Sequence, residues 1–113
     1  MLDPYSIRRE GRDVHLVLRG HFSADAALGS TDAFRALVGM DAIRFIVYIG
    51  ELDGYDKEAR LAWQKVLAPM RKQISTIVFV GNASPLIRMA AATVALAVGL
   101  HMRFVARPED IPK

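Results

Sequence analysis

Two apolar runs on either side of a helical pattern constrain this chain more than any other feature of its sequence. Residues 43–49 and 74–80 are rich in β-branched and aromatic side chains, which is typical of strands covered on both faces. Between them, residues 56–70 carry apolar side chains at helical spacing, and Asp56 stands at the capping position. A strand, a helix and a second strand in this order predict a parallel pair joined by a helical crossover.

The remaining segments extend this unit into an α/β arrangement. Polarity alternates on both sides of Gly11, which predicts an antiparallel hairpin whose second strand ends at Gly20. The further expected elements are a loop over 21–29, a helix over 31–40 capped by Ser30, a loop over 50–55, a helix over 85–98 and a strand over 102–105. We therefore predict one α/β domain over residues 1–113. Its sheet is mostly parallel with four to five strands, an antiparallel N-terminal edge hairpin and about three helices.

Composition and charge exclude several classes of protein. The 113 residues contain no cysteine, so disulfides, thiolate metal sites and cysteine nucleophiles are excluded. The first residues lack the basic-then-apolar pattern of a signal peptide, which predicts a cytoplasmic protein. Residues 1–56 carry a formal charge of −3 and residues 57–113 carry +6, and the positive side chains are scattered. We expect no nucleic-acid partner, because such proteins gather their positive charge on one face.

The sequence contains no recognisable set of catalytic, cofactor-binding or metal-binding residues. The histidines, His15, His21 and His101, are not spaced with another ligand as a helical metal pair requires. Ser23 beside His21 or Asp25 lacks the nucleophile elbow and the glycine run that nucleophilic catalysis uses. Glycine-rich phosphate loops are absent too. We therefore expect a protein that is not an enzyme and holds no cofactor.

A family resemblance rests on three consecutive segments. These are the strand at 45–49, the stretch 51–56 leading into the helix that bears Trp63, and the strand at 77–81 that ends in small residues. Read together, residues 43–105 resemble the STAS domains, the family of anti-sigma-factor antagonists and of sulfate-transporter tails, and within it the SpoIIAA-like branch. The resemblance implies a bacterial regulatory module that works through protein partners.

The residues that carry the family's phosphorylation site are replaced by other residue types in this chain. Bacterial antagonists of the family carry Asp-Ser-(Ser/Thr)-Gly at the start of the helix after the third strand, and a partner kinase phosphorylates a serine there. Here the matching residues are Asp56, Lys57, Glu58 and Ala59, so charged side chains replace both hydroxyls. The resemblance therefore implies a module without the phosphorylatable serine at this position.

Two loops at the carboxyl ends of parallel strands form a candidate recognition rim. Open α/β sheets usually bind ligands at this edge. The residues of this predicted rim are Asp53, Tyr55, Asp56, Lys57, Asn82 and Ser84. Ordinary turn and capping chemistry is the alternative explanation for each of them.

The helix over 85–98 is apolar on all sides, and Arg88 is its only charged residue. It is not a membrane span, because the uncharged run over 89–100 is shorter than the roughly 20 residues that a bilayer needs. A helix of this kind must be covered on both faces. The cover of its outer face is either the ends of the chain or another molecule. We predict that this face joins two copies of the chain, giving a homo-oligomer and most simply a dimer. The residues assigned to this face are Met89, Ala92, Thr93, Leu96 and Leu100.

These observations favour a non-catalytic regulatory or protein-interaction module of the STAS type, with a protein partner that the sequence does not identify. The alternative is a domain that binds a small apolar ligand or a lipid, since related folds enclose apolar ligands between helices and sheet. The two hypotheses differ in where the functional surface lies. The first uses the recognition rim and the outer face of the helix over 85–98, and the second uses the interior.

Overall fold

The predicted strand–helix–strand unit forms the centre of the structure. The computed structural model describes residues 3–113. In chain order, its elements are β1 (Tyr5–Glu10), β2 (Asp13–Phe22), α1 (Ala24–Val38), β3 (Ile43–Tyr55), α2 (Lys57–Met70), the 3-10 turn η1 (Arg71–Gln73), β4 (Ile74–Val80), α3 (Pro85–Val98), β5 (Met102–Val105) and the 3-10 turn η2 (Pro108–Asp110). The strands lie in one sheet in the order β1-β2-β3-β4-β5. The predicted fold class is confirmed.

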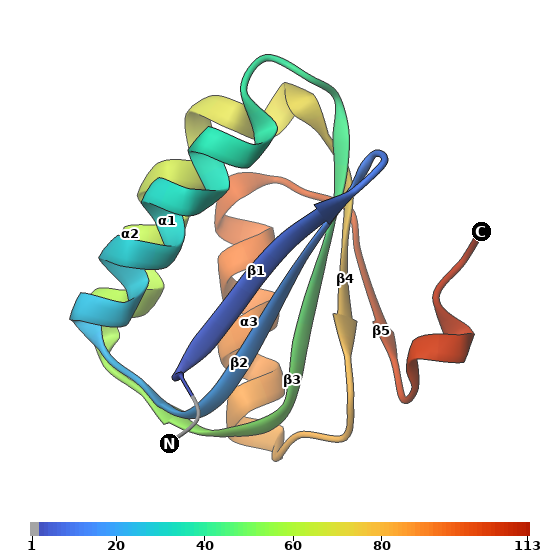
Figure 1. Cartoon of the computed structure of the whole chain (residues 1–113). Helices are drawn as coiled ribbons and strands as arrows, with labels where there is room; N and C mark the ends of the chain where they lie inside the picture. The colour runs from blue at the N-terminus through green and yellow to red at the C-terminus, as the bar shows by residue number, and fades with distance from the viewer. Residues whose placement is uncertain (1–2) are drawn as a thin grey trace.

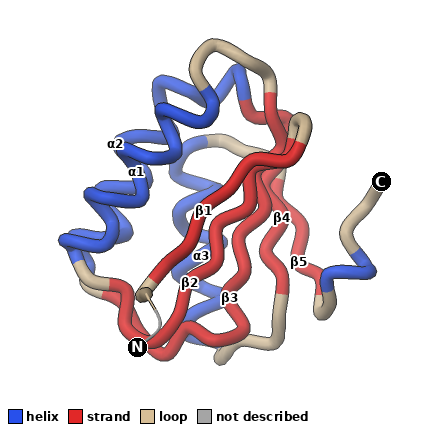
Figure 2. The backbone as a smooth tube through the Cα atoms, in the orientation of Figure 1, coloured by secondary structure: helices blue, strands red, loops and turns tan. Residues whose placement is uncertain are grey.

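All three helices lie on one side of the sheet (Figures 1 and 2). The first two strands are antiparallel, and β2 to β5 pair in parallel. Parallel strands are joined by right-handed crossovers. Because each new strand is added at the same edge of the sheet, every right-handed crossover passes over the same face. The result is a two-layer structure with one helical face and one face without helices.

Aromatic packing between the helices and the sheet forms the main core. The rings of Phe34 on α1 and Phe45 on β3 have centroids 4.5 Å apart, and Trp63 on α2 lies 5.3 Å from each. The Trp63 indole N–H donates a 3.2 Å hydrogen bond to the Ser30 hydroxyl, which in turn donates to the Ala27 carbonyl at 3.0 Å. Polar groups in this core are therefore satisfied rather than free to react.

A smaller apolar cluster covers the other face of the sheet. Ile46, Val78 and Val80 are buried there, and Ile111 of the C-terminal segment packs against them. His15 also lies on this face, away from the helices. The residue is only 8% exposed, and its Nδ1 is 2.8 Å from the Tyr48 hydroxyl. The predicted cover on both faces thus comes from helices on one face and from the chain's own end on the other.

The first helix begins earlier than the sequence predicted. It starts at Ala24, and Ser23 caps it by accepting a 3.1 Å hydrogen bond from the Ala26 amide. The prediction of a loop over 21–29 is wrong from Ala24 onward, and Ser30 does not cap the helix, since it is buried within it. The helix expected over 31–40 is present as the second half of α1, which ends at Val38. Packing of Ala27 against the core stabilises a segment that carries no clear apolar period.

The third strand ends later than predicted. It continues through the expected loop at 50–55 to Tyr55, because this stretch pairs with an extension of β2 beyond Gly20. Register partners there are Gly20 with Leu52 and Phe22 with Tyr55. Asp53-Gly54 is a typical turn sequence, but here both residues lie in a strand because of this pairing. The extension carries β3 past the end of β4. It places Leu52 and Tyr55 on the side of the sheet that faces the helices.

Candidate functional site

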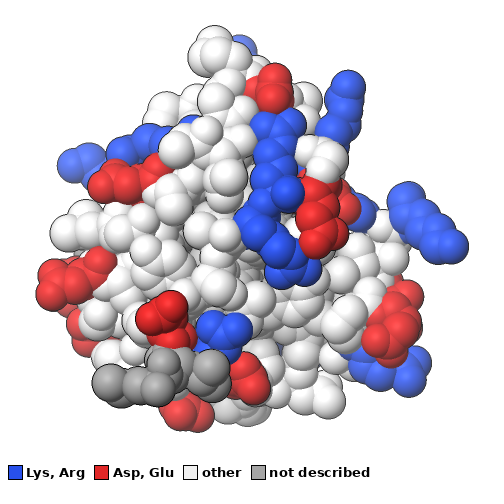
Figure 3. Space-filling model, in the orientation of Figure 1, with Lys and Arg blue, Asp and Glu red and all other residues white. Residues whose placement is uncertain are grey.

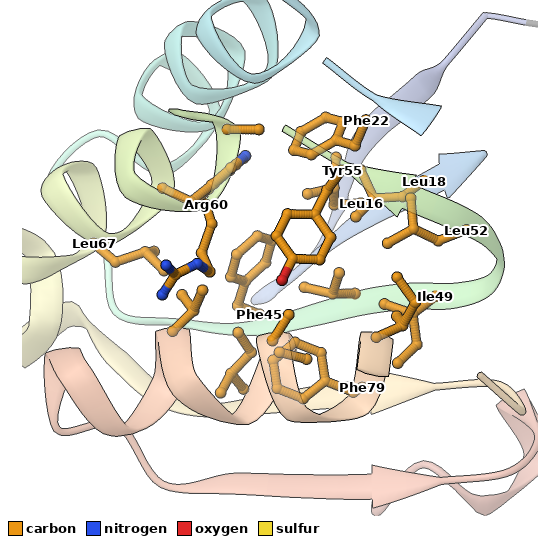
Figure 4. Close-up of a pocket in the computed structure, with 18 residues that line it drawn as sticks. Leu16, Leu18, Phe22, Phe45, Ile49, Leu52, Tyr55, Arg60, Leu67 and Phe79 are labelled. Atoms are coloured by element: carbon orange, nitrogen blue, oxygen red, sulfur yellow. The ribbon is translucent and has the colours of Figure 1, made fainter. Parts of the chain in front are cut away.

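A cavity of about 90 Å³ lies between α2, α3 and the helical face of the sheet, and it opens to solvent (Figure 4). Its lining is aliphatic and aromatic except at two positions, Tyr55 and Arg60. The residues that line it are Leu16, Leu18, Phe22, Phe45, Val47, Ile49, Leu52, Tyr55, Ala59, Arg60, Trp63, Leu67, Ile77, Phe79, Ile87, Ala90, Ala91 and Val94. Small ligands usually bind in such a setting, where an apolar wall carries a few polar groups.

Small side chains on the facing surfaces of the two helices leave this space open. Ala59 on α2 and both Ala90 and Ala91 on α3 line the cavity. An alanine fills less of the gap between a helix and its neighbours than a leucine or methionine does. The extension of β3 adds Leu52 and Tyr55 to the wall. The alternative hypothesis from the sequence placed an apolar ligand between the helices and the sheet. The residues that line the cavity were not predicted, because its walls come from segments far apart in the chain.

Two polar side chains reach the cavity without strong partners. The Arg60 guanidinium donates through Nη1 to the Gln64 amide oxygen at 3.3 Å, which is a long and neutral contact. Among residues 3–113, no carboxylate lies within ion-pair distance of Arg60, and the Tyr55 hydroxyl has no hydrogen-bond partner. Both side chains line the cavity, but the surface that they present to it is apolar (Figure 4). The cavity is therefore suited to an apolar group.

The predicted capping residue of α2 has a different role. Asp56 precedes the helix but makes no capping hydrogen bond. Its carboxylate instead accepts a 2.8 Å contact from His21 Nε2 and a 3.0 Å hydrogen bond from the Ala24 amide. The contact with His21 has the largest effect in lowering the pKa of the Asp56 carboxyl, and the hydrogen bond from the Ala24 amide lowers it further. Asp56 therefore joins the first residues of α1 and α2.

Sequence reasoning missed this His21–Asp56 pair. The signal was present in the strand order, since β2 and β3 are neighbours and His21 lies opposite Gly54. The imidazole lies so close to Gly54 that a Cβ there would meet His21 Nδ1 at 3.1 Å. A side chain at position 54 would therefore crowd the imidazole and require it to shift by a few tenths of an ångström. The pair is exposed, with 58% of the His21 side chain and 41% of the Asp56 side chain accessible.

The predicted recognition rim is not one polar cluster. Asp53, Lys57 and Asn82 are exposed, and Ser84 caps α3 by accepting a 3.3 Å hydrogen bond from the Ile87 amide. Within the part of the chain that the structure describes, no hydrogen bond or ion pair connects residues 53–57 with residues 82–84. The strands β3 and β4 are neighbours, but β3 runs on beyond β4, and Tyr55 lies in the cavity wall instead of a loop.

The outer face of α3 is exposed and apolar. Met89 and Leu96 are 67% and 68% exposed, and Leu86, which the sequence analysis did not single out, is exposed to a similar degree. Thr93 lies between them and donates to the Met89 carbonyl at 2.8 Å, while Ala92 is half-buried. Leu100 does not belong to this surface. It is only 7% exposed, because the chain turns back to the sheet after α3 and buries it in the main core.

Other kinds of site receive no support from the described residues. Across residues 3–113, no three histidine or acidic side chains converge as a metal site requires. No helix in the same range is long and apolar enough to cross a membrane. On the face seen in Figure 3, basic side chains form a band near the centre, and acidic side chains lie directly beside it.

Comparisons with known proteins bear on the fold. No family model matches the sequence, and no curated protein matches it. A solved structure of an uncharacterised DUF3478-family protein with a SpoIIAA-like fold, from Shewanella loihica PV-4, matches with a TM-score of 0.73 and 17% identity over 94% of this chain and 87% of that one. The chain has a SpoIIAA-like fold. The anti-sigma factor antagonist SpoIIAA in its unphosphorylated form matches with a TM-score of 0.61 and 14% identity over 87% of this chain and 86% of that one.

At these identities the comparisons establish the SpoIIAA-like fold and nothing finer. The resemblance that residues 43–105 predicted is confirmed at this level. The match covers more of the chain than the sequence pattern did, because it includes the hairpin of β1 and β2 and the helix α1. The function must therefore be argued from the side chains that this chain places on the shared fold.

Proposed function

We propose that this protein is a non-catalytic binding module whose cavity takes a small, largely apolar ligand. The observation that carries the proposal is the open apolar cavity between α2, α3 and the sheet. Filling it removes apolar surface from water, which is favourable by about 25 cal/mol per Å² of surface buried. Comparable empty apolar cavities in proteins bind small hydrocarbons. The surface that lines the cavity is apolar, which fits an apolar ligand.

A SpoIIAA-like fold shared with an anti-sigma factor antagonist supports a regulatory use of such binding. Filling the cavity would fix α2 and α3 against each other, so that a protein partner reads the bound state. The first turn of α2 begins with Lys57 and Glu58, which have no hydroxyl to phosphorylate. Ligand binding would then take the place of a phosphoserine switch in this chain.

The experiment follows the fluorescence of Trp63, the only tryptophan of the chain and part of the cavity wall, during titration with hexan-1-ol. We expect a saturable change in the unaltered protein. Ala90→Leu narrows the cavity and should weaken binding at least fivefold, whereas Ala97→Leu, on an exposed position of the same helix, should leave binding unchanged. Thermal unfolding shows that both variants are folded.

Two outcomes would contradict the proposal. One is a fluorescence signal that never saturates in the unaltered protein. The other is equal binding by the two leucine variants, which would place the alcohol elsewhere on the molecule. If Ala90→Leu does not fold, Ala91→Val makes a smaller change in the same wall and should weaken binding in the same direction.

Self-association through α3 is a second candidate function, favoured by the exposure of Met89 and Leu96 on one face of the helix. Residues three and four positions apart lie next to each other along a helix, so Met89, Thr93 and Leu96 form one continuous ridge. Leu96→Glu places a charge in the middle of it. Sedimentation should then show a dimer for the unaltered protein and a folded monomer for the variant. A monomeric unaltered protein at high concentration would remove this candidate.

A further inference from the structure

We infer that the surface around the cavity opening, where α2 and α3 lie side by side, binds an acidic amphipathic helix of a partner protein. One apolar side chain of that helix would enter the cavity. This inference rests on the proposed function, because the cavity must accept an apolar group, and it names the kind of molecule that carries this group. It depends on the side chains that each helix presents at the opening and on the recessed position of the apolar lining.

The α3 side of the opening is apolar and uncharged. The Arg88 guanidinium lies 4.6 Å from the centroid of the Phe104 ring on β5, so this flank of α3 faces β5. Ala90 is two residues further along, or about 200° around the helix, and it lines the cavity between α3 and α2. Leu86 lies one turn before Ala90 and is 67% exposed. Because Arg88 is the only charged residue of α3, no charge is left on the flank towards α2.

The α2 side of the opening carries cations that have no ion-pair partner. Arg60 belongs to the cavity wall, but the surface there is apolar, so its charged end is not part of the lining. Arg71 follows directly after α2, and a Cβ at Gly99 would lie 3.4 Å from its Nη1, which places this guanidinium at the end of α3. Within residues 3–113, neither arginine is in an ion pair, whereas most of the arginines that precede α2 are. A partner that lies between the two sides meets positive charge on one side only.

The separation of the two cations sets the length of the partner segment. Arg60 and Arg71 are eleven residues apart, which is about three turns and about 16 Å along a helix. A partner helix that lies along the opening and reaches both arginines needs at least this length. Its carboxylates would lie on the flank towards α2, and its uncharged flank would contact Leu86 on α3. Complementary charge of this kind sets the orientation of a partner and speeds its association.

The shape of the opening favours a helix over an extended strand or a bilayer. A docked strand needs free backbone groups beside it, but within α2 and α3 these groups are bonded along each helix. A flat bilayer surface does not reach the apolar lining, which is recessed between the helices and the sheet. A helix satisfies its own backbone and projects single side chains, and amphipathic helices bind apolar grooves in this way.

The test measures the binding of a synthetic peptide of about 16 residues, long enough to reach both arginines, through the fluorescence of Trp63. The peptide contains no tryptophan; its leucines form one stripe, and its glutamates form the flank beside that stripe. In the control peptide, glutamine replaces every glutamate. At low ionic strength we expect the acidic peptide to bind at least fivefold more tightly than the control peptide. Hexan-1-ol should compete with both peptides, because each places a leucine in the cavity.

The variants separate the two sides of the opening. Arg60→Gln and Arg71→Gln should each lower the preference for the acidic peptide about threefold and leave the control peptide's affinity unchanged. Lys65→Gln is the matched control, because it removes the same charge from an exposed position on another side of α2, and it should leave the preference unchanged. Leu86→Ala should weaken both peptides equally. Thermal unfolding shows that the variants are folded.

Three results would overturn the inference while apolar binding stands. The first is equal affinity of the unaltered protein for the two peptides, or failure of both to bind when hexan-1-ol does. The second is a preference for the acidic peptide that survives in both arginine variants or falls equally in Lys65→Gln. The third is binding to phosphatidylglycerol vesicles without binding to either peptide, which would make this surface a membrane contact. If hexan-1-ol does not bind, the proposed function fails and this inference fails with it.

Discussion

The helical face of the sheet is packed with interlocking aromatic and aliphatic side chains, whereas the opposite face combines a small apolar cluster with polar contacts and the end of the chain. On the first face, Phe34, Phe45 and Trp63 contact one another. On the second, His15 pairs with Tyr48, and Arg44 forms a 2.8 Å ion pair with Asp13. The strand β3 thus contributes to both faces, because its side chains alternate between them: Phe45 lies on the first face and Arg44 on the second.

The difference follows from the topology. With every crossover on one side, the helices can cover only one face, and residues 106–113 pass over the other, where Ile111 packs against the sheet. The Arg44 guanidinium also donates to the Pro112 carbonyl, which fastens this segment to the sheet. Three helices cover one face and leave a cavity between themselves and the sheet, whereas a single segment covers the other face. Stability and binding should therefore respond differently to changes on the two faces.

The largest effect is expected from Phe34→Ala on the helical face. Phe34 is fully buried between Phe45 and Trp63, so its removal leaves a cavity that the neighbours cannot fill. The free energy of unfolding should fall by about 3–5 kcal/mol, as measured by urea denaturation. A loss below about 1 kcal/mol would mean that the aromatic cluster is not the main source of stability.

A smaller effect is expected from Ile111→Ala on the opposite face. Ile111 is half-buried against Ile46, Val78 and Val80, so roughly half of an isoleucine's burial energy is at stake. We expect a loss of about 1 kcal/mol in the free energy of unfolding, with no change in ligand affinity. If the loss equalled that of Phe34→Ala, the two faces would form one cooperative core and the comparison would break down.

The smallest effect is expected from the protonation of His15. Desolvation, together with the nearby Arg8, lowers the pKa of His15 below its ordinary value. Below about pH 6.5 the unfolded chain takes up a proton that the folded protein disfavours, so the free energy of unfolding should decrease as the pH falls. Above that pH, His15 contributes no pH dependence.

Denaturant melts between pH 7 and 5 measure this decrease, and His15→Gln should remove His15's share of it. The lowered pKa values of Glu10, Asp13 and Asp56 act in a more acidic range, so they do not obscure the comparison. If the free energy of unfolding decreased equally with falling pH in His15→Gln and in the unaltered protein, the protonation of His15 would not contribute to this decrease.

The parts of the fold that the sequence predicted correctly are those with strong local signals. The runs at 43–49 and 74–80 and the stripe on α2 identify a parallel strand–helix–strand unit without any tertiary information. Ser84 followed by Pro85 gives the start of α3, and Gly99, with a φ of 83°, gives its end. In these segments the local preference and the tertiary packing agree.

The start of α1 and the end of β3 depend instead on distant partners. Gly29 weakens the helical pattern of α1, yet a Cβ there would meet the Tyr5 hydroxyl at 2.8 Å, so the glycine serves the packing of β1 on the helix. Gly54 looks like a turn residue, but it lies in a strand under the His21 ring. The role of neither glycine can be predicted from the residues next to it in the sequence.

The candidate site was less predictable than the fold for the same reason. Ala59 and Ala90 are ordinary helix residues in sequence, and a cavity arises only when their helices face each other over the sheet. Arg60 is a charged residue of a surface helix in sequence, yet part of its side chain lines the cavity. The register between β2 and β3 was also needed before His21 could be assigned to Asp56.

The strand order β1-β2-β3-β4-β5 has a consequence for how this chain folds. Each strand pairs with the strand made just before it, so no part of the sheet waits for a segment synthesised much later. On a ribosome, the hairpin and α1 can form first, and every following helix and strand then adds to an edge that already exists. Each parallel pairing closes a loop that contains one helix and does not span the whole chain. The open edge of the sheet stays exposed until the next strand has been made, and an unpaired edge can pair with another chain.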